Sequence, residues 1–173
     1  IMVIKRIYYS DNGIFKIPNN VSEISNEAAA FDTTVKTIGL GQQSIKFGGK
    51  AFYQTSVEKV CGLDGNKEFD STMFLTDEAQ SLKNEADNTI EIHTESFSKC
   101  TKLHTVIIPK TKRIIIESFA FSGCCNLRSF EIQADDIEIS DSAFEGCPNL
   151  TLISNCDFVE RFSREHGIRF LRI

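Results

Sequence analysis

The chain has 173 residues, the size of a single domain, and 41% of them are hydrophobic, which is enough for a packed core. Its formal net charge of −5 disfavours a nucleic-acid-binding protein, because such proteins carry a basic surface. No apolar run approaches the ~18 residues that a transmembrane helix needs, and the start from Ile1 to Lys5 lacks the layout of a signal peptide. We therefore expect neither a nucleic-acid partner nor a transmembrane segment.

The first 20 residues differ from the rest of the chain and are expected to form an N-terminal cap or a partial repeat. Apolar residues Ile4 and Ile7 precede the dipeptide Asn12-Gly13, and Ile14 and Ile17 follow it. An Asn-Gly pair between apolar strands is a strong hairpin signal. The sequence therefore predicts a hairpin at this end.

A line of sequence then recurs at a nearly fixed period. It is clearest around Phe97, Phe121 and Phe144, which are 24 and 23 residues apart. Counted from this marker phenylalanine, apolar residues lie at −7 and −5, Cys at +3, Leu at +6, and apolar residues at +9 and +11, although Asn155 stands at +11 of the last copy. A repeat of this length is one coil of a solenoid, in which neighbouring coils bury each other's apolar side chains.

Earlier copies extend the period toward the N-terminus. The copy around Phe52 is one residue shorter after the marker, so that Val57 and Val60 take the Leu and +9 places. The copy around Phe74 is crowded by charged residues, and we expect an irregular or looped-out coil there. Its remaining apolar positions are Phe69, Ala79 and Leu82.

Two frames fit the first copy. Phe31 is the obvious marker, but a frame with Ala29 in the marker place fits better, because it brings Ile24, Ile38 and Leu40 into register. Either frame gives six coils, and the repeats then occupy residues 21–155.

Each coil contains two short runs rich in Ile and Val, such as Val106–Ile108 and Ile114–Ile116, which predict β-strands. The segment between marker and Cys suits a single turn, such as a 3₁₀ turn. Strands of successive coils would stack in parallel about 4.8 Å apart. The predicted fold class is a mainly β solenoid of about six coils of 22–24 residues, forming one domain over residues 1–173. Residues 156–173 should close it with a short helix, capped by Gly167, and a strand.

The repeats resemble a known family, the BspA-type leucine-rich repeat. Its consensus is similar to the lines Ile116-x-x-x-Ala120-Phe121-x-x-Cys124-x-x-Leu127 and Ile17-Pro18-x-x-Val21-x-x-Ile24, and the segment from Phe162 to Phe170 looks like the usual family ending. The resemblance covers about residues 17–173 and implies a leucine-rich-repeat superhelix. It also implies a surface protein of bacteria or protists that adheres to host proteins or other cells. It brings no catalytic site, because the matching positions are structural.

The six cysteines and three histidines form no motif for a metal or catalytic centre. Cys100, Cys124 and Cys147 recur at +3, where buried free thiols are a better interpretation than disulfides or metal ligands, because Cys packs as a small hydrophobe. We therefore expect no cofactor, no metal and no catalytic residue. Reduced thiols favour an intracellular chain, in conflict with the surface protein that the resemblance implies.

The candidate binding site is one face of the strand that follows each repeat Leu. Side chains alternate along a strand, so positions +8 and +10 should point outward. Exposed Ile107 and Leu152 would form part of an apolar stripe, as partner-binding surfaces do. The predicted outward residues are Lys59, Thr105, Ile107, Ser129, Glu131, Leu152 and Ser154, with Cys61 in the short coil.

The sequence thus predicts a non-enzymatic protein–protein interaction module. We expect a cell-surface, adhesin-like protein that binds a protein ligand through this strand-lined face. One alternative is an intracellular scaffold or adaptor on the same fold, and a more remote one is an enzyme or a metal protein.

Overall fold

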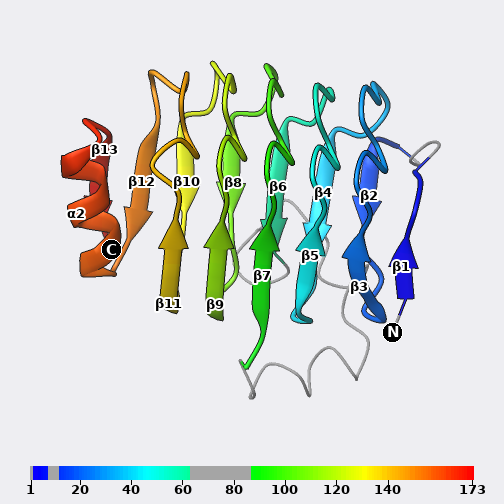
Figure 1. The fold of residues 1–173 in the computed structure, drawn as a ribbon, viewed down its shortest axis with the longest axis horizontal. Coiled ribbons are helices and arrows are strands. Elements are labelled where there is room, and N and C mark those ends of the chain that lie inside the picture. Colours follow the sequence, from blue (N-terminus) through cyan, green and yellow to red (C-terminus); the bar gives the residue numbers. More distant parts are fainter. Residues whose placement is uncertain (1, 8–11, 63–86) are drawn as a thin grey trace.

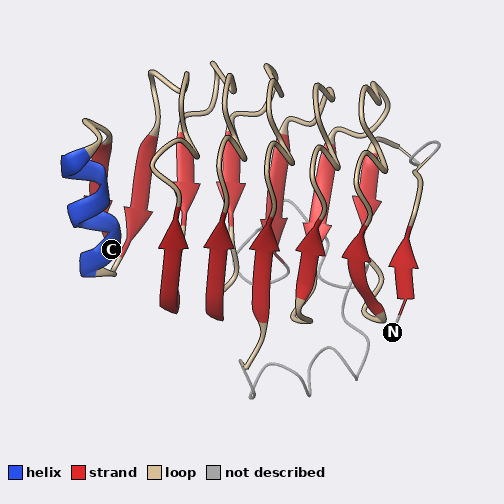
Figure 2. Cartoon of the chain, in the orientation of Figure 1, coloured by secondary structure: helices blue, strands red, loops and turns tan. Residues whose placement is uncertain are grey.

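The computed structural model describes residues 2–7, 12–62 and 87–173. They wind into a solenoid whose two walls are parallel β-sheets, with a helix at the C-terminal end (Figure 1, Figure 2). Sheet A has the order β1 (Met2–Ile4), β3 (Val21–Ile24), β5 (Ile45–Phe47), β7 (Thr89–Ile92), β9 (Thr111–Ile116) and β11 (Ala134–Ile139). Sheet B has the order β13 (Arg169–Arg172), β12 (Thr151–Ser154), β10 (Ser129–Glu131), β8 (Thr105–Ile107), β6 (Lys59–Gly62), β4 (Thr37–Leu40) and β2 (Ile14–Lys16).

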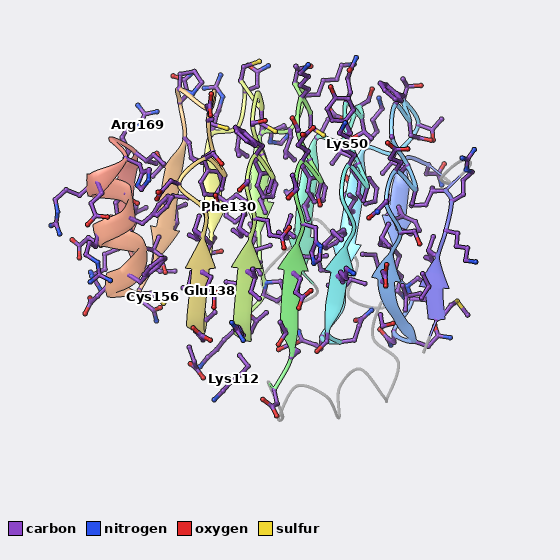
Figure 3. The ribbon with its side chains drawn as sticks, in the orientation of Figure 1. Lys50, Lys112, Phe130, Glu138, Cys156 and Arg169 are labelled. Atoms are coloured by element: carbon purple, nitrogen blue, oxygen red, sulfur yellow. The ribbon has the colours of Figure 1, made fainter. Side chains whose placement is uncertain are left out.

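Pairing in register places equivalent residues of successive coils side by side. On sheet A, Ile90 pairs with Ile114. On sheet B, Val106 pairs with Phe130, which in turn pairs with Leu152 (Figure 3). All five side chains are buried between the sheets, because they occupy the inward positions of the strand alternation. The apolar periodicity of the sequence therefore becomes one continuous core.

The turns at the marker positions join the two sheets along one edge of the solenoid. The rings of Phe52, Phe97, Phe121 and Phe144 stack in sequence, with neighbouring centroids 5.2–5.7 Å apart. Residues two positions after the marker have left-handed backbone, as at Gly123, where φ is 72°. Such a φ lets the chain reverse tightly enough for the marker ring to enter the core.

The Ala29 frame of the first copy is confirmed. The N–H of Ala29 donates to the Ala51 carbonyl at 2.8 Å, as the N–H of Phe52 donates to the Ser96 carbonyl at 2.7 Å one coil later. Ala29 is buried, whereas Phe31 is 63% exposed at the rim of the turn. Alanine therefore takes the marker place in the first coil.

The described strands build about five coils, one fewer than the predicted six. β5 pairs directly with β7, and β6 pairs directly with β8, so no further strand lies between them in either sheet. The predicted copy around Phe74, with Phe69, Ala79 and Leu82, lies outside the described residues.

The N-terminal strands do not form the predicted hairpin. β1 lies in sheet A, parallel to β3, and β2 lies in sheet B, parallel to β4. The prediction for Asn12-Gly13 is wrong because each strand has a better partner in the next coil, where its register continues the repeat. Asn12 and Gly13 still form a left-handed turn, with φ of 52° and 77°.

The C-terminal end is closed by α2 (Asp157–Glu165) and β13, where the sequence predicts a helix and a strand. Val159 and Phe162 on the helix are buried against the end of the core. Gly167 follows the helix with a φ of 65°, and the N–H of Ile168 donates to the Ser163 carbonyl at 2.8 Å. This is a glycine helix end, which turns the chain back into sheet B.

Candidate functional site

The outer face of sheet B carries two rows of side chains that cross its strands. Because the strands pair in register, equivalent outward residues lie next to one another. The first row is Ile14, Thr37, Lys59, Thr105, Ser129, Thr151 and Arg169. The second row is Lys16, Gly39, Cys61, Ile107, Glu131, Ile153 and Leu171.

Most of the predicted site residues lie in these rows on β6, β8 and β10, and each of them is partly exposed. They are Lys59, Thr105, Ile107, Ser129 and Glu131. The remaining predicted outward position in this group, Cys61, is in the second row but fully buried. It therefore offers no accessible surface.

The predicted outward placement of Leu152 and Ser154 is wrong, because both are 0% exposed. Leu152 pairs with the inward Phe130. The Ser154 hydroxyl donates to the Ile132 carbonyl at 2.5 Å and accepts from the N–H of Cys156 at 3.1 Å. Ser154 is thus a satisfied core serine that links β12 to the start of α2.

Leu152 and Ser154 point inward because the link between the repeat Leu and β12 is shorter than in the preceding coil. Leu127 lies three positions before its inward strand residue, but Leu150 lies only two before Leu152. Since side chains alternate, a shift of one residue exchanges every inward and outward position. The sequence does contain a signal, because Asn155 puts a polar residue at the +11 core place. Thr151 and Ile153 are therefore the outward residues of β12.

We call the outer residues of β8, β10, β12 and β13 the binding strip. Ile107, Ile153 and Leu171 share one of its rows, and Leu171 is 52% exposed. No ion pair joins any two members of the strip, all of which are described. The members are Thr105, Ile107, Ser129, Glu131, Thr151, Ile153, Arg169 and Leu171.

Besides Thr151 and Ile153, sequence reasoning missed two further members of the strip, Arg169 and Leu171 on β13. Arg169 ends the first row beside α2 (Figure 3). The alternation from Ile168 to Ile173 already predicts the strand, and it could have placed both residues on the outer face. The missing information was the register of this strand against β12.

The repeat cysteines are buried in the core, as predicted. The thiol of Cys124 donates to the Phe97 carbonyl at 3.1 Å, and that of Cys147 donates to the Phe121 carbonyl at 3.2 Å. A small apolar side chain with a weak donor thus satisfies the marker carbonyl of the preceding coil. Burial raises the pKa of Cys147 to about 12. Cys125 is exposed, so the adjacent pair points in different directions, as predicted.

The histidines lie apart and have structural partners. His93 Nε2 is 2.9 Å from Glu91 Oε2, and His166 Nε2 is 3.1 Å from Asp141 Oδ1. In the described part of the chain, no three His, Cys, Asp or Glu side chains are placed to hold a metal ion. The helices described there also include none with the length and apolar character needed to cross a membrane.

Comparisons with known proteins identify the repeat. The family model for the BspA type leucine rich repeat region, in six copies, matches residues 7–80 and 67–165. Among solved structures, the chain is similar to a leucine-rich repeat protein from Bacteroides ovatus, with 17% identity and a TM-score of 0.49. That match covers 92% of this chain but only 42% of the other. No protein of curated function matches the sequence. Since the family model covers most of the chain, the protein belongs to the BspA-type leucine-rich repeat family.

Proposed function

We propose that the protein is a non-catalytic interaction module that binds a protein ligand through the binding strip. The observation that carries the proposal is the row of Ile107, Ile153 and Leu171, whose partly exposed apolar side chains stand on neighbouring or nearby strands of one rigid sheet. Glu131 lies between Ile107 and Ile153 in this row, so the apolar surface is interrupted by one charge, and apolar surface with polar neighbours is typical of partner-binding sites. Membership of a repeat family supports the same proposal, because solenoids present extended surfaces to partners.

The two rows would contribute differently to binding. Burial of the apolar row supplies the favourable term, about 25 cal/mol for each Å² removed from water, from which the cost of association is subtracted. Thr105, Ser129 and Thr151 provide hydroxyl groups that can donate and accept hydrogen bonds at the strand spacing. Glu131 and Arg169 add charges of opposite sign, which would select the orientation of the ligand. Lys59 extends the same surface onto β6.

We test the site with two glutamate variants of the apolar row, Ile107→Glu and Ile153→Glu. The matched control is Ile115→Glu, which changes an outward isoleucine of β9 on sheet A. Labelled protein is titrated onto intact source cells, and we expect both strip variants to lose at least about tenfold in affinity, or about 1.4 kcal/mol. The control should bind as the original protein does. Equal loss in all three variants, or in none, would exclude the strip as the site.

We further propose that the ligand is met at the cell surface, where the protein acts in adhesion. The support is its family membership, because proteins with this repeat are often associated with surfaces. Intact source cells are treated with a membrane-impermeant amine reagent, and the exposed Lys102 and Lys110 provide labelling sites. Labelling before lysis is expected. Labelling only after lysis would reject the surface location and leave the binding strip to be tested with intracellular partners.

A specific observation favours a second candidate, an intracellular scaffold. Cys125 is exposed and forms no disulfide among the described residues, and such thiols are more common in reducing compartments. Trapping of thiols in the native protein distinguishes the candidates. An unmodified Cys125 thiol in freshly isolated material supports the scaffold, whereas complete oxidation or capping of this thiol supports exposure to an oxidising environment.

A further inference from the structure

We propose a second interaction surface, an aromatic rim on the marker turns that binds an acidic segment of a partner protein carrying an apolar side chain. The rim lies along the edge of the solenoid where the marker turns join the two sheets, and Lys50 is labelled there in Figure 3. It does not depend on the binding strip, which occupies the outer face of sheet B. The members of the rim are Phe31, Lys50, Tyr53, Lys99 and Lys102.

Phe31 is exposed and strained, although it contributes little to the core. Its side chain is 63% exposed, and its backbone φ of 66° lies in the left-handed region, which is unfavourable for a bulky residue. The equivalent residues of the last coils are Gly123 and Gly146, for which such a φ has no steric penalty. Strained residues that the fold does not require are found at binding sites, so Phe31 indicates a partner at this edge.

A second ring and two cations adjoin Phe31. The rings of Phe31 and Tyr53 meet edge to face, with centroids 5.6 Å apart. The N–H of Phe31 also donates to the Tyr53 carbonyl at 2.9 Å, so neighbouring coils hold the two residues together. The ammonium groups of Lys50 and Lys99 lie 5.3 and 5.7 Å from the centroid of the Tyr53 ring, within the range of cation–π attraction. The rim thus combines exposed aromatic surface with positive charge.

Two lysines of the rim have no acidic partner. Lys99 and Lys102 form no ion pair with a carboxylate in the described part of the chain. Both line a hollow of about 390 Å³, together with Gln54. Lys50 pairs with Glu95 at 3.7 Å, but both side chains are partly exposed. A hollow with two unpaired ammonium groups is complementary in charge to the carboxylates of a ligand.

The surroundings of the rim favour a short acidic segment over a long polyanion. On the N-terminal side of Phe31, a second hollow is lined by two carboxylates, Glu27 and Asp32, and by one cation, Arg6. The whole chain has a net charge of −5. A nucleic acid or a sulfated polysaccharide would extend its regular negative charges from the lysines onto these carboxylates, which repel them. A protein segment can place an apolar side chain against Phe31 instead and keep its carboxylates at the lysines.

A neutral saccharide is also a poorer occupant. It would cover the ammonium groups of Lys99 and Lys102 without providing a counter-charge, and burial of an unpaired charge is costly. A sugar ring would further need an open aromatic face on which to stack. The Tyr53 ring already has two ammonium groups near it and meets Phe31 at an interplanar angle of 83°.

The test is a titration with peptides, followed in amide NMR spectra at low ionic strength. The probe is the acetylated and amidated peptide Asp-Glu-Phe-Leu-Asp-Glu. The control, Asn-Gln-Phe-Leu-Asn-Gln, keeps the shape of the probe and removes its charges. We expect the acidic probe to cause saturable shifts at Tyr53, Gln54, Lys99 and Lys102, and the neutral peptide to bind at least about tenfold more weakly. Added salt should weaken binding of the acidic probe, because salt screens exposed charges.

Variants locate the effect on the rim. Lys99→Gln combined with Lys102→Gln should weaken binding of the acidic probe at least about tenfold. Lys110→Gln combined with Lys112→Gln makes the same change in net charge at the opposite edge, where Lys112 is labelled in Figure 3, and should have little effect. Phe31→Gly should also weaken binding but keep the melting temperature near that of the original protein, because glycine tolerates the left-handed φ.

The proposal is overturned if the neutral and acidic peptides bind equally, or if the control pair of variants loses as much binding as the rim pair. It is overturned if the rim amides shift when the protein alone is concentrated, because a second copy would then occupy the rim. It also fails if a single-stranded oligonucleotide saturates the same amides at lower concentration than the acidic peptide. A large fall in melting temperature for Phe31→Gly would show that the ring serves the fold and would remove the basis of the proposal.

Discussion

The outer faces of the two sheets are built on the same repeat but carry different chemistry. On sheet A, charged neighbours pair across the strands: Arg113 Nε is 3.1 Å from Asp136, and Lys112 Nζ is 3.4 Å from Asp135. Arg113 also bonds to Glu138, and Lys112 and Glu138 are labelled on β9 and β11 in Figure 3. On the binding strip of sheet B, hydroxyl and apolar side chains predominate, and its two charged members, Glu131 and Arg169, form no ion pair with each other.

This difference shows that the inward positions of the strands determine the fold, whereas the outward positions determine the chemistry of each exposed face. Most inward positions of both sheets are apolar and buried, as Ile114 on sheet A and Val106 on sheet B illustrate. The outward positions do not determine the coil and are therefore available for function. Sheet A uses many of its outward charges on its own neighbours, whereas the strip leaves apolar surface in contact with water. We infer that the strip is the face adapted to a partner.

The largest expected effect on the free energy of unfolding comes from deleting one ring of the marker stack in the core between the two sheets. Phe97→Ala deletes a ring stacked between Phe52 at 5.3 Å and Phe121 at 5.2 Å. We expect the free energy of unfolding to fall by about 3–5 kcal/mol, as for other buried aromatic truncations. Urea denaturation measures it. Phe31→Ala at the exposed turn rim is the control and should cost under about 1 kcal/mol; similar losses for both would contradict the stacked core.

A second pair of variants tests the corrected register of β12. Ser154→Ala leaves the Ile132 carbonyl and the Cys156 N–H without their hydroxyl partner in the interior. The free energy of unfolding should fall by about 1–3 kcal/mol. Ser129→Ala removes a hydroxyl from the outer face and should stay within about 0.5 kcal/mol of the original protein. If Ser129→Ala were the more damaging change, the assignment of inward and outward positions would be reversed.

The buried thiols predict a loss of stability at alkaline pH. Burial raises the pKa of Cys147 from 9.0 to about 12, so between these values the unfolded chain has lost a proton that the folded protein keeps. Stability is complete below pH 9 and falls as the pH rises toward 12, by at most about 1.4 kcal/mol per pH unit for one thiol. Cys147→Ala should reduce this slope in denaturation curves at pH 8 to 10.5. Ser129→Ala, a change on the outer face of β10, should leave this slope unchanged.

The smallest effect concerns the ion pairs that distinguish sheet A. Arg113→Ala removes the partner of Asp136 and Glu138 and should lower the melting temperature slightly in low salt. The difference from the original protein should shrink in 1 M NaCl, because salt screens exposed charges. Arg128→Ala, on the exposed residue before β10, should change the melting temperature less at either salt concentration. If both variants lowered the melting temperature equally, and both losses shrank in high salt, the outer faces of the two sheets would not differ in their ion pairs.

Much of the fold could be predicted because each coil repeats the same inward pattern. The markers Phe97, Phe121 and Phe144, the Ala29 frame and the buried +3 cysteines all follow from one template. The direct pairing of β5 with β7 agrees with the irregular or looped-out coil that the charged residues around Phe74 lead us to expect. The failure of the hairpin at Asn12-Gly13 could not be predicted, because a local turn signal competes with parallel partners in the next coil.

The outward residues were predicted correctly on the strands that keep the common spacing after the repeat Leu, and incorrectly on β12, where that spacing is one residue shorter. Thr105 and Ser129 pair in register on β8 and β10, as the common spacing after Leu requires. Leu152 failed because one residue is missing from the link before β12, and strand alternation turns that small change into a reversal of faces. The N–H groups of Phe144 and Gly146, which have no partner among the described residues, leave no mark in the sequence, because they depend on α2 following β12 in place of another marker turn.

Site-specific photo-crosslinking tests the central claim most directly. A photoreactive amino acid replaces Ile153 on the binding strip or Ile115 on sheet A, and each protein is irradiated on intact source cells with and without excess unlabelled protein. The predicted result is one discrete adduct from position 153 that the unlabelled protein competes away, with no such adduct from position 115. Equal adducts from both positions, or an adduct from position 115 alone, would contradict the assignment of the binding face to sheet B.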